Sequence, residues 1–116
     1  QDLDELVGEA DLSRAILLVH VPPHDTKVDR ASPEWAPGSD ESWDPHVGSI
    51  AVRRLIETRQ PLLGLHGHVH ESARQSGTWR DRIGRTHLFS AAHGGDELAL
   101  VRFDLENLEK ASRELL

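Results

Sequence analysis

The feature that most constrains the fold of this chain is the run Ala15 to Val21 (AILLVHV), a continuous apolar stretch of strand length. Such a run is typical of a strand buried on both faces, as in the parallel sheets of α/β proteins. Leu62 to Leu65 has the same character and predicts a second buried strand. Between the two runs, Ser49 can cap a helix over residues 50–59. The sequence therefore predicts an α/β fold in which helices flank a mixed β-sheet.

The remaining segments supply further elements. Their patterns predict a short helix or turn within residues 2–14, strands at 86–92 and 98–103 joined by a turn at 94–96, and a helix or an edge strand at 106–115. Two segments are predicted as loops: residues 22–46, which hold five prolines, and residues 71–82, which are polar. A length of 116 residues suits one ordinary domain, so we expect a single domain over residues 1–116.

The composition argues against several classes of partner. With 20 acidic against 13 basic residues and a net charge of −7, the chain shows no basic stripe for a nucleic-acid backbone. Its longest apolar run is far too short to cross a bilayer, so we expect a cytoplasmic protein without a membrane partner. The chain has no cysteine, so any metal must be bound by histidine, aspartate or glutamate. It begins at Gln1 and has no methionine, which predicts that it is part of a longer polypeptide.

Histidines lie where the two buried strands are expected to end. His66, His68 and His70 occupy every second position at the end of the second apolar run, and His20 lies at the end of the first, close to a proline pair. If the backbone stays extended, the three alternating side chains point the same way. Ligands of open α/β sheets bind beyond the carboxyl ends of the strands, and neutral imidazole is the commonest metal ligand. This pattern predicts a metal site at one rim of the sheet.

The motifs around these histidines resemble those of a known family. GHVH (Gly67 to His70), with VHVPP and its His20 upstream, is similar to the two C-terminal signature blocks of the calcineurin-like metallophosphoesterases. PPHDTKVD (residues 22–29) and HVGS (residues 46–49) resemble segments of a bacterial and archaeal branch of that family. The similarity covers roughly residues 15 to 104. It implies half of the layered α/β/β/α sandwich of these enzymes, with the chain forming the C-terminal part of a calcineurin-like phosphoesterase domain.

The resemblance also implies roles for three histidines. In the family, the histidine of the first block and the first histidine of GHxH bind one metal, and the second histidine of GHxH binds the other. His20 and His68 would then share one ion, and His70 would bind its neighbour. The family blocks Asp-x-His, Gly-Asp and Gly-Asn-His, which supply the bridging aspartate and the other ligands, are not found in the residues that precede His20. The chain therefore resembles only the C-terminal half of such an enzyme.

The chemistry explains why the other half is needed. Two cations about 3.5–4 Å apart hold the phosphoryl oxygens and provide a hydroxide nucleophile at neutral pH. Three histidines split two to one between the ions cannot hold such a pair without a bridging carboxylate. Nothing in the family pattern assigns that role to the loop aspartates Asp25, Asp29, Asp40 and Asp44. The missing ligands must come from the rest of the polypeptide, from another chain, or not at all.

The other histidines admit two interpretations each. His66 lies inside the second strand, where packing or a contact that supports a metal ligand is commoner than metal binding. His46 is predicted either to contact substrate or to lie on the loop surface. For His93 a surface position is the simpler interpretation, although its place beside Gly94 and Gly95 would let it line the site. For His24 and His87 we expect structural or surface positions. No catalytic residue is assigned from the sequence.

The function expected from these features is a hydrolase, a metallophosphoesterase that cleaves phosphomonoesters or phosphodiesters at a dinuclear metal site. Its cofactors would be two divalent ions, Mn, Fe or Zn, in the complete protein. Its substrate would be a phosphate-ester small molecule or a nucleotide, and its partners the missing N-terminal half, a partner chain or a second copy of itself. Two alternatives are a non-catalytic binding or regulatory module with a degenerate phosphoesterase fold, and a single-site metal binder that uses histidines alone.

Overall fold

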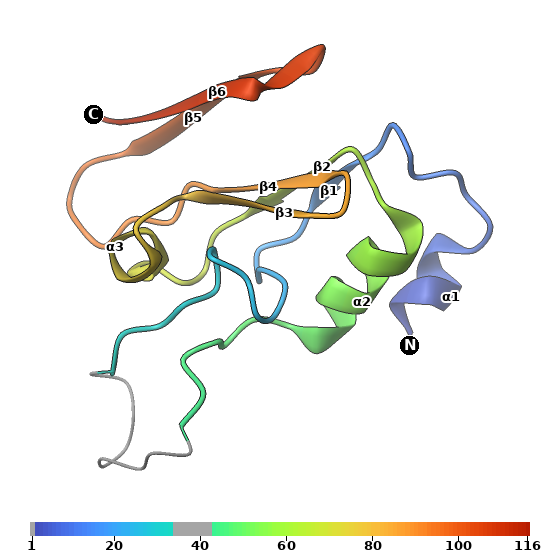
Figure 1. The fold of residues 1–116 in the computed structure, drawn as a ribbon, viewed down its shortest axis with the longest axis horizontal. Helices are drawn as coiled ribbons and strands as arrows, with labels where there is room; N and C mark the ends of the chain where they lie inside the picture. Colours follow the sequence, from blue (N-terminus) through green and yellow to red (C-terminus); the bar gives the residue numbers. More distant parts are fainter. Residues whose placement is uncertain (1, 34–42) are drawn as a thin grey trace.

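Helices and strands form layers around a four-stranded sheet (Figure 1). The computed structural model describes residues 2–33 and 43–116. Its helices are α1 (Leu3–Val7), α2 (Ile50–Arg59) and α3 (Ser72–Ser76). Its strands are β1 (Ile16–Leu18), β2 (Leu63–His66), β3 (Arg80–Ile83), β4 (Thr86–Ser90), β5 (Ala99–Asp104) and β6 (Asn107–Leu115). Helices α1 and α2 lie on one side of the sheet and the β5–β6 hairpin on the other, which confirms the predicted mixed α/β architecture (Figure 1).

The four strands are arranged in the order β1-β2-β4-β3. Strands β1, β2 and β4 are parallel, and β3 runs antiparallel to β4 at the far edge. The register places Leu63 of β2 between Ile16 of β1 and His87 of β4. The three parallel strands therefore end at the same rim of the sheet, and the segments that follow them meet there.

Apolar side chains on the two faces of the sheet form two cores. On the face covered by α2, the buried residues are Val28, Val52, Ile56, Ile83 and Leu88. On the face covered by the hairpin they are Leu63, Phe89 and Leu108. Leu88 and Phe89 are neighbours in β4 and enter opposite cores, as the alternation of side chains along a strand requires.

Helix α2 begins and ends as its sequence predicts. The Ser49 hydroxyl accepts a hydrogen bond from the Val52 amide (3.1 Å), which satisfies one of the free N–H groups of the first turn. The helix ends at Arg59, and Gln60 follows in the left-handed conformation. Pro61 follows directly and is buried.

The prediction that Ala15 to Val21 is buried on both faces is wrong. Only Ile16–Leu18 form strand β1, and β1 is the edge of the sheet. Ile16 is 42% exposed and Leu18 is 81% exposed, so the described chain does not cover the face of β1 on which these alternate side chains lie. By contrast, the predicted burial of the second run is confirmed, since β2 lies between two neighbours and three of its four residues are buried.

The segments from residue 71 onward also differ from their predictions. Residues 71–82 are not one loop, since they contain α3 and most of β3. The turn at residues 94–96 does not join a hairpin, because β4 pairs with β2 and β3 whereas β5 pairs with β6. Of the two interpretations of residues 106–115, the strand is confirmed as β6. Loop 22–46 has neither helix nor strand in its described residues, and Asp40 lies outside them.

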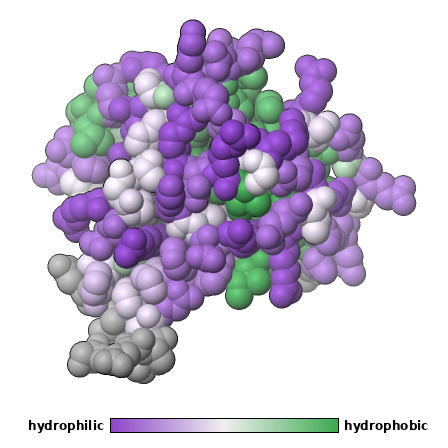
Figure 2. Space-filling view, viewed as in Figure 1, coloured by the Kyte–Doolittle hydropathy of each residue, from purple (hydrophilic) through white to green (hydrophobic). Residues whose placement is uncertain are grey.

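No helix in residues 2–33 or 43–116 has the length and apolar character needed to cross a membrane. The surface view agrees with the composition, because hydrophilic residues cover most of the face shown and hydrophobic residues appear in separate patches (Figure 2).

Candidate functional site

The carboxyl ends of the three parallel strands bring histidines to one rim. His20 lies two residues beyond β1, His68 two residues beyond β2, and His93 three residues beyond β4. His70 lies between His68 and α3. A hollow of about 310 Å³, which we call the rim hollow, is lined by all four of these histidines and by Glu97. The structure therefore brings the three predicted metal ligands together with His93.

His20 and His68 form the tightest pair in the rim hollow. Their ring centroids are 5.1 Å apart and their planes meet at 79°. Two imidazoles that bind one tetrahedral ion through bonds of about 2.0–2.1 Å have ring centroids roughly 5 Å apart. The Gly67 amide donates to the His20 carbonyl (2.9 Å), which fixes the two segments side by side. The spacing of this pair is that of two ligands of one ion.

The backbone at His68 explains why the alternating histidines do not all share one face. His68 has φ 67°, in the left-handed region, so the chain leaves the extended conformation immediately after β2. His68 and His70 are exposed, and Val69 between them is 4% exposed and anchors the turn. An extended backbone, the condition under which His66, His68 and His70 would point the same way, is therefore not met at His68.

His66 is packed within the sheet and is not among the residues that line the rim hollow. Its Nδ1 lies 2.9 Å from the Val19 carbonyl, which can only accept, so Nδ1 carries the proton. Burial lowers the pKa of His66, the hydrogen bond to Val19 opposes that shift, and the ring is neutral. A Cβ at Gly64 would collide with His66 Nε2, so glycine is needed there to admit the ring. The structure places His66 in a packed position, which is one of its two interpretations.

His93 is held by a carboxylate that the sequence did not reveal. His93 Nε2 lies 2.8 Å from Glu97 Oε2, and both side chains line the rim hollow. The hydrogen bond from His93 is the main cause that lowers the pKa of Glu97. Glu97 is one of 20 acidic residues and follows no motif, so only the fold could place it here.

The described residues contain no complete group of metal ligands. Within residues 2–33 and 43–116, no three His, Asp or Glu side chains lie close enough together to hold a metal ion. The His20–His68 pair fits one shared ion, and His70 lines the same hollow. Metal binding by these histidines stays a prediction.

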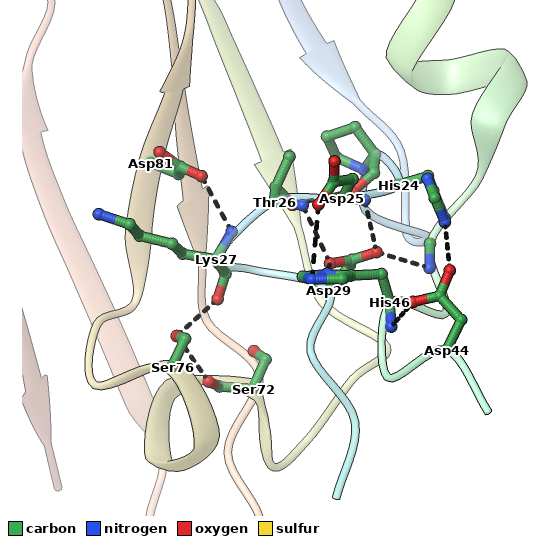
Figure 3. Close-up of polar contacts among 12 residues, drawn as sticks. His24, Asp25, Thr26, Lys27, Asp29, Asp44, His46, Ser72, Ser76 and Asp81 are labelled. Carbon is green, nitrogen blue, oxygen red and sulfur yellow. Dashed lines mark hydrogen bonds and ion pairs between the residues drawn. The ribbon is translucent and has the colours of Figure 1, made fainter. Parts of the chain in front are cut away.

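A second polar cluster lies in loop 22–46 and is built on Asp29 (Figure 3). Asp29 is fully buried, and its carboxylate accepts hydrogen bonds from the amides of Asp25 (3.0 Å), Thr26 (3.1 Å) and Gly48 (3.0 Å). The same carboxylate lies 2.6 Å from His46 Nδ1. It therefore joins residues 25–29 to residues 46–48, and we call this cluster the Asp29 latch. No feature of the sequence distinguishes Asp29 from Asp25 and Asp44, both of which are exposed.

His46 belongs to this latch and is not among the residues that line the rim hollow. Its Nε2 lies 3.5 Å from Asp25 Oδ1. Asp44-Pro45-His46 has the spacing Asp-x-His, but Asp44 faces His24 (3.0 Å) and follows the His20 block instead of preceding it. The His46 amide and then His24 lower the pKa of Asp44. His46 therefore makes a structural contact with Asp29. His24 makes one with Asp44, in line with the structural or surface position expected of it.

The latch also shapes a hollow next to the candidate ligands. Ala31, two residues after Asp29, and Val47, between His46 and Gly48, line a space of about 410 Å³ with His68, His70 and Glu71. His87 lies elsewhere, buried beneath the hairpin with 8% of its surface exposed. Its Nε2 lies 3.8 Å from Glu109 Oε1. Burial is the main cause that lowers the pKa of His87. The buried position agrees with the structural role expected of this residue.

Comparison with known proteins adds no family to this picture. No protein-family model, curated protein or solved structure matches this chain.

Proposed function

We propose that this chain carries the C-terminal half of a calcineurin-like metallophosphoesterase, a hydrolase that cleaves phosphate esters at a two-metal site. The observation that carries the proposal is the His20–His68 pair, whose ring centroids lie 5.1 Å apart at the carboxyl rim of the parallel strands. His70 in the same hollow supports the two-to-one division of ligands that the GHVH motif implies. The layers on the two faces of the sheet support one half of the α/β/β/α sandwich (Figure 1).

Each histidine has a defined part in this proposal. His20 and His68 bind one divalent ion, Mn, Fe or Zn, and His70 binds the second. When bound, the two ions hold the phosphoryl oxygens and supply the hydroxide nucleophile. The turn at His68 accompanies a distance of 5.1 Å between the His68 and His20 ring centroids, and the Gly67–His20 hydrogen bond holds the two strand ends together. The Asp29 latch holds Val47 beside His68 and His70, where it borders the approach of a phosphate-ester or nucleotide substrate.

The remaining ligands come from a further segment of the polypeptide or from a partner chain. The edge strand β1 supports this part of the proposal, because its outer hydrogen-bonding groups have no partner strand in the described chain. Beside β1, an apolar hollow of about 500 Å³ lies between the two sheets and is lined by Leu18, Leu65, Leu100 and Phe103 among others. Unpaired edges and apolar surfaces are what a completing element covers.

Hydrolysis of p-nitrophenyl phosphate and bis-p-nitrophenyl phosphate with added Mn²⁺ tests the proposal. We expect the 116-residue chain alone to be inactive, because it lacks the bridging carboxylate. The protein isolated from its own cells, with any further segment or partner chain retained, is expected to show metal-dependent turnover that His68→Ala abolishes. A His24→Ala variant is the control, since His24 lies in the Asp29 latch region and not in the rim hollow. Metal-independent turnover, or none in the isolated protein, would overturn the proposal.

Metal counting separates this proposal from its alternatives. Two ions per complete protein are expected for the enzyme, one for a site made of histidines alone, and none for a degenerate binding module. Mass spectrometry under native conditions gives the count directly.

A further inference from the structure

We propose that His93, held by Glu97, is the group that protonates the leaving oxygen during ester hydrolysis. This inference rests on the proposed phosphoesterase function and names a catalytic residue that neither the motifs nor the family pattern supply. His93 would touch the substrate and Glu97 would act as its positioning residue.

The location of the pair is the first argument. His93 and Glu97 line the rim hollow together with His20, His68 and His70. They also line an adjoining hollow of about 280 Å³, which is bordered by His70 and Arg74. The pair therefore borders both the hollow of the candidate metal ligands and an adjoining space that can receive the part of the substrate that leaves. The His93 side chain is 24% exposed, so its ring is open to a bound molecule.

The hydrogen bonding of the pair is the second argument. Glu97 Oε2 lies 2.8 Å from His93 Nε2, and no hydrogen bond to His93 Nδ1 is found among the described residues. A donor oriented by a carboxylate through one ring nitrogen, with the other nitrogen free, is the usual arrangement of a histidine acid or base. In hydrolysis, His93 acts as the imidazolium, with one proton on Nε2 toward Glu97 and one on Nδ1. The phosphorus–oxygen ester bond breaks, the leaving oxygen takes the Nδ1 proton, and the ring becomes neutral. Water supplies the oxygen that joins phosphorus, and one of its protons restores the ring.

Gly95 provides the third argument, because its backbone lies directly beneath the pair. A Cβ at this position would lie 2.6 Å from Glu97 Oε2 and 2.7 Å from His93 Nε2, so any larger residue forces the ends of these side chains to shift. At Gly94 a Cβ would meet only the His70 carbonyl, at an ordinary 3.7 Å. Gly95→Ala therefore disturbs the geometry of the pair without removing either group, and Gly94→Ala is its matched control.

The pair itself is tested without turnover, by ¹⁵N–¹H NMR of the histidine rings in the metal-free chain. We expect the wild type to show the proton of neutral His93 on Nε2, facing Glu97. Glu97→Gln and Gly95→Ala should change the His93 ring signals, and Gly94→Ala should leave them as in the wild type. Unchanged His93 signals in both Glu97→Gln and Gly95→Ala would overturn the pairing and the proposal with it.

The catalytic role is tested by the choice of leaving group, in the protein isolated with whatever completes its site. An alkyl phosphate needs a proton on its leaving oxygen, whereas p-nitrophenyl phosphate does not. His93→Gln should slow the alkyl phosphate by about 10²–10⁴-fold, the usual contribution of a positioned acid, and leave p-nitrophenyl phosphate turnover close to wild type. Equal rates in wild type and variant, or an equal loss on both substrates, would overturn this inference alone. No turnover by the wild type would overturn the proposed function, and the role of His93 would fall with it.

Discussion

At the scale of single residues, two histidines that the rim does not use control the response of the fold to acid. His66 is 6% exposed and His87 is 8% exposed. Burial lowers the pKa of both, although nearby Arg82 also contributes at His87. Histidine in the unfolded chain has a pKa of about 6.5, so the unfolded state binds protons first as the pH falls. The stability gained by burying the two histidines in their neutral form is fully present above about pH 6.5, and it is lost as the pH falls below that value.

Urea denaturation between about pH 7.5 and pH 5 measures this effect, and one such histidine contributes up to about 1.4 kcal/mol per pH unit. We expect the free energy of unfolding to fall as the pH is lowered through this range. His66→Gln should reduce the slope, because it removes one of the two groups, while His24→Gln should not. Identical slopes in the wild type and His66→Gln would show that His66 is not buried in its neutral form.

At the scale of elements, the Asp29 latch determines the path of loop 22–46 on both sides of the rim. Asp29→Asn keeps the shape of the side chain but removes the charge that three amides and His46 share. We expect a loss of about 1–3 kcal/mol in the free energy of unfolding, the usual cost of a broken buried polar contact. Amide hydrogen exchange at residues 25, 26 and 48 should also quicken. Asp81→Asn is the control, since its carboxylate accepts hydrogen bonds only at exposed positions, from the amides of Lys27 and Arg82. Equal losses in the two variants would contradict the latch.

The elements also show what the sequence could predict. Helix α2 was predicted residue for residue, because the Ser49 cap and the proline after it are local signals. Strand β3 could not be predicted, since Arg80, Asp81 and Arg82 are polar and become a strand only by pairing with β4. The exposure of Leu18 could not be predicted for a similar reason, because an apolar run does not indicate whether another element will cover its side chains.

The rim was predictable in part. The GHVH spacing located His68 and His70, and their meeting with His20 followed from the rule that parallel strands end at one edge. Glu97 and Asp29 were missed, because each becomes significant only through a tertiary contact with a histidine.

At the scale of the whole molecule, β1 and the apolar hollow beside it predict association with another chain or segment. Leu18 is 81% exposed on an edge strand, and exposed apolar edges pair readily. We expect light scattering to give a mass above that of one chain, rising with concentration. Leu18→Lys should lower that mass, whereas Leu6→Lys should not, although Leu6 on α1 is 63% exposed. A monomeric wild type at all concentrations would contradict the prediction.

The central claim is that His20, His68 and His70 are metal ligands, and calorimetric titration of the protein with Mn²⁺ or Zn²⁺ tests it most directly. Loss of a ligand removes a coordinate bond, and even supporting residues of metal sites typically contribute 10–100-fold to affinity. We therefore expect His20→Ala and His68→Ala to weaken the binding of one and the same ion by about 100-fold or more. His70→Ala should weaken the binding of the second ion. His24→Ala should bind as the wild type does. Equal affinities in His68→Ala, His24→Ala and the wild type would contradict the account.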